Sequence, residues 1–120
     1  MTVIANALVA LVAVLHLLFL VLEMFLWTKP VGLKTFRMTA QKAADSAVLA
    51  ANQGLYNGFL AAGLAWGLFA GRAEFALQIK TFFLVCVIVA GVFGAVTVSW
   101  RILLVQAAPA VLALALLYLA

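Results

Sequence analysis

Two ionisable side chains with complementary acid and base chemistry occur in an otherwise apolar stretch near the start of the chain. His16 and Glu23 lie about 20° apart around a helix, because each residue turns the helix by about 100°. A carboxyl in a membrane-spanning segment is costly and by default marks a functional site. Together with the imidazole of His16, the Glu23 carboxyl could hold a ligand or a proton. Trp27 continues the same stripe and completes the first half of a candidate site.

The second half lies in NQGLYNGFLAAG, residues 52–63. In an antiparallel pair of helices, Asn52 and Gln53 reach the depth of Glu23, while Tyr56 and Asn57 approach the depth of His16. Gln106 falls in the same half of the membrane as Glu23. The predicted ligand-binding set is therefore His16, Glu23, Trp27, Asn52, Gln53, Tyr56, Asn57 and Gln106. A purely structural interpretation stays open, in which the amides form interhelical hydrogen bonds that fix the helix register.

The composition indicates that the solvent of this chain is lipid. Of its 120 residues, 70% are hydrophobic and only 8% are charged, which a water-soluble domain of this size does not tolerate. Apolar runs of about 20 residues cross the hydrocarbon core as helices. The sequence predicts a single membrane domain over 1–120 with helices at 3–27, 40–70 (membrane part 48–70), 75–98 and 102–119, and a loop at 28–39. The expected fold class is an all-α membrane protein, an antiparallel up-and-down bundle of four transmembrane helices.

Small and cyclic residues divide and pack these helices. Pro30 and Gly32 are expected to end the first helix just beyond Trp27, and Thr39 to cap the second. Pro109 is expected either to kink the fourth helix or to mark where its first turn frees a carbonyl. Glycines mark close helix approaches within the chain, with a homo-oligomer seam as the less favoured interpretation. The packing glycines are Gly54, Gly58, Gly63, Gly67, Gly91 and Gly94.

The charges predict topology rather than a nucleic-acid partner, although the formal net charge is +4. Basic residues on one predicted side of the membrane are Lys29, Lys34, Arg37, Lys42 and Arg101, against Arg72 and Lys80 on the other. This bias puts the 28–47 loop in the cytoplasm and both termini outside, in a multi-pass protein. The lone Cys86 has no partner in the chain for a disulfide.

The same residues carry a resemblance to a known family. HLLFLVLEMFLW (16–27), KTF (34–36) and ANQGLYNGFLAAGL (51–64) resemble the hallmark pattern of small bacterial membrane proteins catalogued as domain of unknown function 1304. The resemblance implies a four-helix protein of the bacterial inner membrane, and it supplies no activity. The positions that match the motif are His16, Glu23, Trp27, Asn52, Gln53, Gly54, Tyr56 and Asn57.

Three classes of function remain after these observations. The favoured hypothesis is binding or transport of a small or lipophilic molecule at the polar site, with membrane lipids as further partners. The second is a scaffold or accessory protein whose polar residues only register helices. An enzyme acting on a lipidic substrate ranks last, because His16 and Glu23 are about 10 Å apart along the axis and no nucleophile, metal cluster or phosphate loop accompanies them. Neither a metal ion nor a cofactor is expected.

Overall fold

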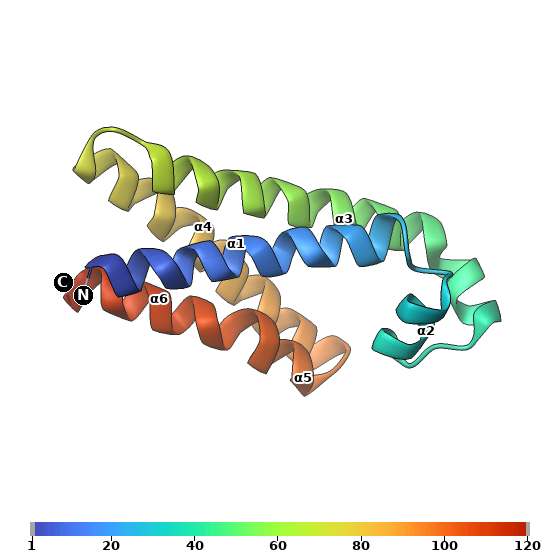
Figure 1. The fold of residues 1–120 in the computed structure, drawn as a ribbon. Coiled ribbons are helices and arrows are strands. Elements are labelled where there is room, and N and C mark those ends of the chain that lie inside the picture. Colours follow the sequence, from blue (N-terminus) through green and yellow to red (C-terminus); the bar gives the residue numbers. More distant parts are fainter. Residues whose placement is uncertain (1, 120) are drawn as a thin grey trace. The chain divides into compact units, whose positions relative to one another are not determined.

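The computed structural model describes residues 2–119, and all the regular secondary structure in that range is helical (Figure 1). The elements are α1 (Thr2–Met24), α2 (Pro30–Phe36), α3 (Ala40–Phe69), α4 (Ala73–Thr97), α5 (Trp100–Ile102), the π-helical turn η1 (Leu103–Ala107) and α6 (Ala108–Leu119). These residues divide into two compact units, one made of 2–15 with 60–119 and the other of 16–59. Each unit is described by itself.

Three helical segments in residues 2–119 are long and apolar enough to cross a membrane: Thr2–Met24, Ala73–Thr97 and Trp100–Leu119. The longest helix, α3 with 30 residues, is not among them. Asn52, Gln53 and Asn57 lower its hydropathy over the part that the sequence predicts as a second span. The membrane part at 48–70 and the bundle of four transmembrane helices therefore stay predictions.

The first unit has a core made by four helices. α1 contributes Val9, Val12 and Ala13, α3 contributes Leu64, α4 contributes Leu84 and Val87, and α6 contributes Ala110 and Ala113. Among the fully buried residues α6 contributes only alanine methyl groups, and its Leu114 and Leu117 pack, partly buried, against the same core. The backbone of α6 can therefore lie close to this core.

Glycines of the first unit lie where helices come close. A Cβ on Gly63 would meet the Phe83 ring, and one on Gly67 would meet the stem of Lys80. α3 and α4 are therefore antiparallel neighbours, as the short connection at residues 70–72 predicts. Further along α4, Gly91 faces Ala107 and Gly94 faces Ile102, so α4 also packs against η1 and α5.

Pro109 shapes the start of α6. Proline lacks an N–H group, and its ring would collide with the carbonyl four residues earlier in a regular helix. The chain widens into the π-helical turn η1 directly before it, and the Ala108 N–H bonds the Leu103 carbonyl. The fourth predicted helix is thus divided into α5, the π turn η1 and α6, and a kink at Pro109 stays a prediction.

In the second unit, α1 ends at Met24, so the helix predicted to reach Trp27 is shorter than expected. Lys29 precedes a proline, which disfavours helical backbone, and it is extended with φ −85° and ψ 162°. Pro30 does not merely stop a helix: it occupies the first turn of α2, inside the segment predicted as a loop. Gly32 faces the carbonyl oxygens of Leu26 and Trp27, which leave no room for a Cβ.

Thr39 caps α3, as the sequence predicts. Its hydroxyl oxygen accepts a hydrogen bond of 3.1 Å from the Lys42 backbone N–H. One turn further on, the exposed Gln41 side chain donates to Asp45 over 2.9 Å. α3 thus begins well before its apolar part, and its first turns carry charged and polar side chains on the surface.

A pair of glycine substitutions tests the close approach of α4 and η1. In Gly91→Ala, the new Cβ would lie 2.7 Å from the Ala107 Cβ and 3.1 Å from its backbone nitrogen, so backbone must move. We expect a net destabilisation, because overpacking costs about 1–3 kcal/mol and the gain in helix propensity is at most about 1 kcal/mol. Gly71→Ala is the matched control, since nothing lies within 4 Å of its Cβ position. Equal melting temperatures for the two variants in detergent would contradict the packing.

Candidate functional site

The central contact of the second unit joins α1 to α3. The Asn57 side-chain Nδ2 donates to Glu23 Oε1 over 2.5 Å, and both residues are partly buried. The carboxyl and the amide come from helices that are distant in sequence but antiparallel in this unit. A carboxyl among apolar side chains costs much less when it is hydrogen-bonded, so this contact makes Glu23 tolerable there.

Two glycines of α3 make room for this contact. A Cβ on Gly54 would lie 2.6 Å from the Met24 side chain and 3.2 Å from both the Glu23 Cβ and the Leu20 carbonyl oxygen. A Cβ on Gly58 would lie 2.7 Å from the Leu20 side chain. The two positions are one turn apart on either side of Asn57, so the α3 backbone can approach α1 along the whole length of the polar contact.

The residue that hydrogen-bonds Glu23 differs from the ones expected from the sequence, which placed Asn52 and Gln53 at the depth of Glu23. Helical side chains lean toward the N-terminus of their own helix. In an antiparallel pair, the two side chains therefore lean in opposite directions along the common axis. The head of Glu23 reaches back along α1 and that of Asn57 reaches back along α3, so they meet although their Cα atoms lie at different depths.

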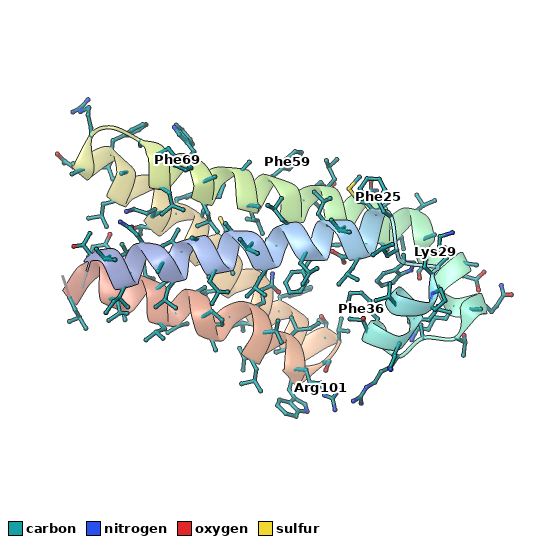
Figure 2. The ribbon with its side chains drawn as sticks, in the orientation of Figure 1. Phe25, Lys29, Phe36, Phe59, Phe69 and Arg101 are labelled. Atoms are coloured by element: carbon teal, nitrogen blue, oxygen red, sulfur yellow. The ribbon has the colours of Figure 1, made fainter. Side chains whose placement is uncertain are left out.

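The remaining polar residues of the motif lie outside this contact. Asn52 and Gln53 are exposed, and neither hydrogen-bonds a side chain in the described part of the chain. Tyr56 is 55% exposed, and its ring centroid lies 6.1 Å from that of Phe59. Figure 2 shows Phe59 projecting outward from α3. Within the second unit, only Asn57 of the four predicted α3 residues contacts the Glu23 carboxyl.

His16 and Gln106 are placed in different units. His16, in the second unit, is fully buried, and its ring meets that of Phe19 edge to face at 5.3 Å. Gln106 belongs to the first unit, where it is partly buried in the π turn η1. Neither residue is without a partner. That His16 and Gln106 contribute to the Glu23 site remains a prediction from the sequence.

Trp27 anchors the turn that follows α1. Its indole Nε1 donates to Ser46 Oγ over 3.1 Å, and its ring packs against Phe36 with centroids 4.8 Å apart. Figure 2 shows Phe36 on α2 and Lys29 in the turn before it. The contact ties the turn, α2 and α3 together within the second unit. Ser46 was missed by the sequence reasoning, since a serine on the polar part of a helix carries no distinguishing signal.

The sequence reasoning also missed a polar contact in the first unit. Lys80 was counted only as a charge that sets the membrane topology, yet it is only 7% exposed on α4 and its Nζ donates to Asn6 Oδ1 on α1 over 2.8 Å. The available signal was position: Lys80 follows the start of α4 by two turns, so its charge lies inside the helix.

The Glu23 carboxyl retains capacity for a further partner. Asn57 binds one of its oxygens, and no side chain of residues 2–119 bonds the other. Such a carboxyl can accept a hydrogen bond, hold a proton or pair with a cation. No group of three His, Cys, Asp or Glu side chains within that range could hold a metal ion. The arrangement is that of a small polar group in apolar surroundings.

Comparison with known proteins places the chain in a family. The family model described as "Protein of unknown function (DUF1304)" matches residues 10–118. The chain belongs to the DUF1304 family. It is similar to the uncharacterized protein YpaA of Lactococcus lactis subsp. lactis (strain IL1403), with 32% identity over 116 residues that cover 95% of this chain and 96% of the relative. No solved structure matches it. The family match reaches both units, and neither comparison assigns an activity.

Two Asn→Ala substitutions on α3 test the geometry. Asn57→Ala removes the hydrogen bond to the partly buried Glu23, so we expect a loss of about 0.5–2 kcal/mol in unfolding free energy. Asn52→Ala removes an exposed amide and should change stability by less than about 0.5 kcal/mol. Unfolding in mixed detergent micelles, followed by circular dichroism, measures both. If Asn52→Ala were the more damaging variant, the register found here would be wrong.

Proposed function

We propose that this DUF1304 protein is a multi-pass membrane protein in which α3 is the fourth transmembrane helix. Support comes from the large apolar side chains that face outward: Phe69 is 86% exposed and Val96 81% exposed. Similar residues cover the outer surfaces of α1 and α6. Monomeric proteins in water rarely expose so much contiguous apolar surface, whereas lipid solvates it. The polar residues of α3 then require partners in the membrane.

The charge distribution supports an orientation for this proposal. Lys29, Lys34 and Arg37 lie between the end of α1 and the start of α3, Lys42 lies in the first turn of α3, and all four are exposed. Arg101, on α5, is exposed as well and extends away from the helix (Figure 2). By the positive-inside rule these residues face the cytoplasm of a bacterial inner membrane, and both termini lie outside.

Cysteine labelling tests this orientation. In a Cys86→Ala background, we expect Asp45→Cys to react with a membrane-impermeant maleimide only after the cells are permeabilised, because residues 28–47 face the cytoplasm. Arg72→Cys, in the connection between α3 and α4, should react in intact cells. The reverse labelling pattern would show that the topology is inverted. Labelling of both positions from the same side would show that α3 does not span the membrane.

For its activity, we propose that the protein binds a small lipophilic molecule bearing a cation or a hydrogen-bond donor. The single observation that supports this is the Glu23 carboxyl, held by Asn57 through one oxygen within an apolar segment. A carboxyl is an expensive group for merely joining two helices, since a pair of neutral amides would do so at lower cost. Its second oxygen has the chemistry to recognise such a molecule, and apolar side chains around it suit the remainder of the ligand.

A structural role is the second candidate, and a specific observation favours it. Gly54 and Gly58 bring α3 against α1 at the level where Asn57 meets Glu23. Close packing together with a hydrogen bond is the usual way in which membrane helices fix their register. On this alternative, the carboxyl–amide pair stabilises the second unit and needs no ligand.

Native mass spectrometry of the protein extracted in mild detergent separates the two candidates. For a binding protein, we expect a co-purifying lipophilic molecule whose retention falls about tenfold in Glu23→Gln, because one charged hydrogen bond contributes about 1.5–3 kcal/mol. Asp45→Asn is the matched control, since it makes the same change of carboxyl to amide at an exposed position. Clean apoprotein from several mild detergents, or equal retention by both variants, would leave the structural role.

A further inference from the structure

A second polar site lies in the first unit, apart from Glu23. A cavity of about 370 Å³ opens where the start of α1, the end of α3, the start of α4 and the end of α6 meet. Thr2 and Asn6 of α1, Lys80 of α4 and Leu117 of α6 are among its lining residues. This volume falls in the range typical of small-molecule pockets.

The cavity holds a positive charge that no described carboxylate neutralises. Lys80 is 7% exposed, and its one hydrogen-bond partner in residues 2–119 is the neutral amide oxygen of Asn6. None of the residues lining the cavity is acidic. Glu74 lies on the same helix, but it is about 120° away around the axis and exposed to the outside. Buried charges in proteins are normally paired, and residues 2–119 supply no carboxylate as counter-ion to this one.

Hydrogen-bond donors from α1 and α4 reach this cavity, next to the carbonyl groups at the end of α3. An ammonium carries three N–H donors, and Asn6 accepts one of those of Lys80. Since its oxygen is occupied, Asn6 offers the N–H groups of its amide. α4 begins at Ala73, which also lines the cavity, and its N-cap residue Arg72 makes no side-chain capping bond. The first backbone N–H groups of this helix therefore add donors and a partial positive charge.

Gly67 makes the position of Lys80 attainable. A Cβ at residue 67 would lie 2.6 Å from the Lys80 Cγ and 3.2 Å from its backbone nitrogen. The aliphatic stem of the lysine therefore lies against the backbone of α3. Lysine side chains in helices lean toward the helix N-terminus, which directs this ammonium to the cavity end of α4.

We infer that this cavity binds a phosphate group. Several donors around one cation match the multiple oxygens of a phosphate, and a helix N-terminus is a common phosphate-binding element. The apolar lining from Leu68, Leu77 and Leu117 would contact an attached carbon chain. The phosphate could come from the headgroup of an anionic lipid, which lies at the level of transmembrane helix ends, or from free phosphate. The site is separate from the ligand proposed for Glu23.

Binding measurements on the full-length protein, purified in maltoside detergent without phosphate buffer, test the inference. Native mass spectrometry with dioleoylphosphatidylglycerol probes the lipid, and phosphorus NMR titration with inorganic phosphate probes the free ion. We expect at least one probe to bind. Binding of the lipid alone identifies a headgroup site, and binding of inorganic phosphate identifies a site for the free ion. If neither probe binds, the inference is wrong.

Three variants show whether the cavity is responsible. Lys80→Met should weaken binding about tenfold or more, because it removes a charged hydrogen-bond donor. Arg72→Met is the matched control: it removes one positive charge from an exposed position outside the lining residues, and affinity should stay within about twofold. Equal losses in the two variants would indicate general attraction of anions and overturn the site.

Asn6→Asp keeps the test decisive if Lys80→Met folds poorly. The new carboxylate would lie beside the Lys80 ammonium and supply the missing counter-ion without changing the size of the side chain. We expect a higher melting temperature together with loss of phosphate binding. Phosphate binding at wild-type affinity in this variant would contradict the inference, because the ammonium would then be neutralised.

Discussion

Polar side chains withdrawn from water must find partners, and this requirement governs how the helices of each unit meet. In the second unit Asn57 donates to Glu23 and Trp27 donates to Ser46; in the first, Lys80 donates to Asn6. Each bond joins helices or turns that are distant in sequence. Apolar side chains can pack in several registers at similar free energy, whereas a hydrogen bond inside an apolar segment is satisfied in only one.

Small residues make these polar contacts geometrically attainable. Gly54 and Gly58 lie against α1 beside the Glu23 contact, and Gly67 lies against the stem of Lys80. In the second unit the glycines and the polar pair join the same two helices, α1 and α3, whereas in the first unit Gly67 of α3 packs against the lysine of α4 that bonds Asn6 of α1. A larger residue at Gly54 or Gly58 would separate α1 from α3 and lengthen the Asn57–Glu23 hydrogen bond, and one at Gly67 would displace the stem of Lys80.

The sequence predicted the helical class, the apolar segments and the Thr39 cap, because periodicity, composition and capping chemistry are local properties. It also selected Glu23 and Asn57, but not their pairing, since Cα depth ignores the lean of side chains along antiparallel helices. The end of α1 was placed too late because apolar residues continue beyond Met24, where Pro30 and the turn before it decide the boundary. The partner of Lys80 could not be predicted, because Asn6 is 74 positions away and a single sequence carries no signal for such a contact.

The π turn η1 has a further effect on the first unit, through the rotational phase of α6. A π turn accommodates about one residue more than an α turn, so everything after it is rotated by about 100° relative to a continuous α-helix. With η1 in place, Ala110 and Ala113 face the core, while Val111 and Leu112 are half exposed. A regular helix through residues 103–107 would turn bulkier side chains toward α4 instead. Deleting a single residue within η1 would therefore rotate α6 by about 100° and turn Val111 toward the core in place of Ala110.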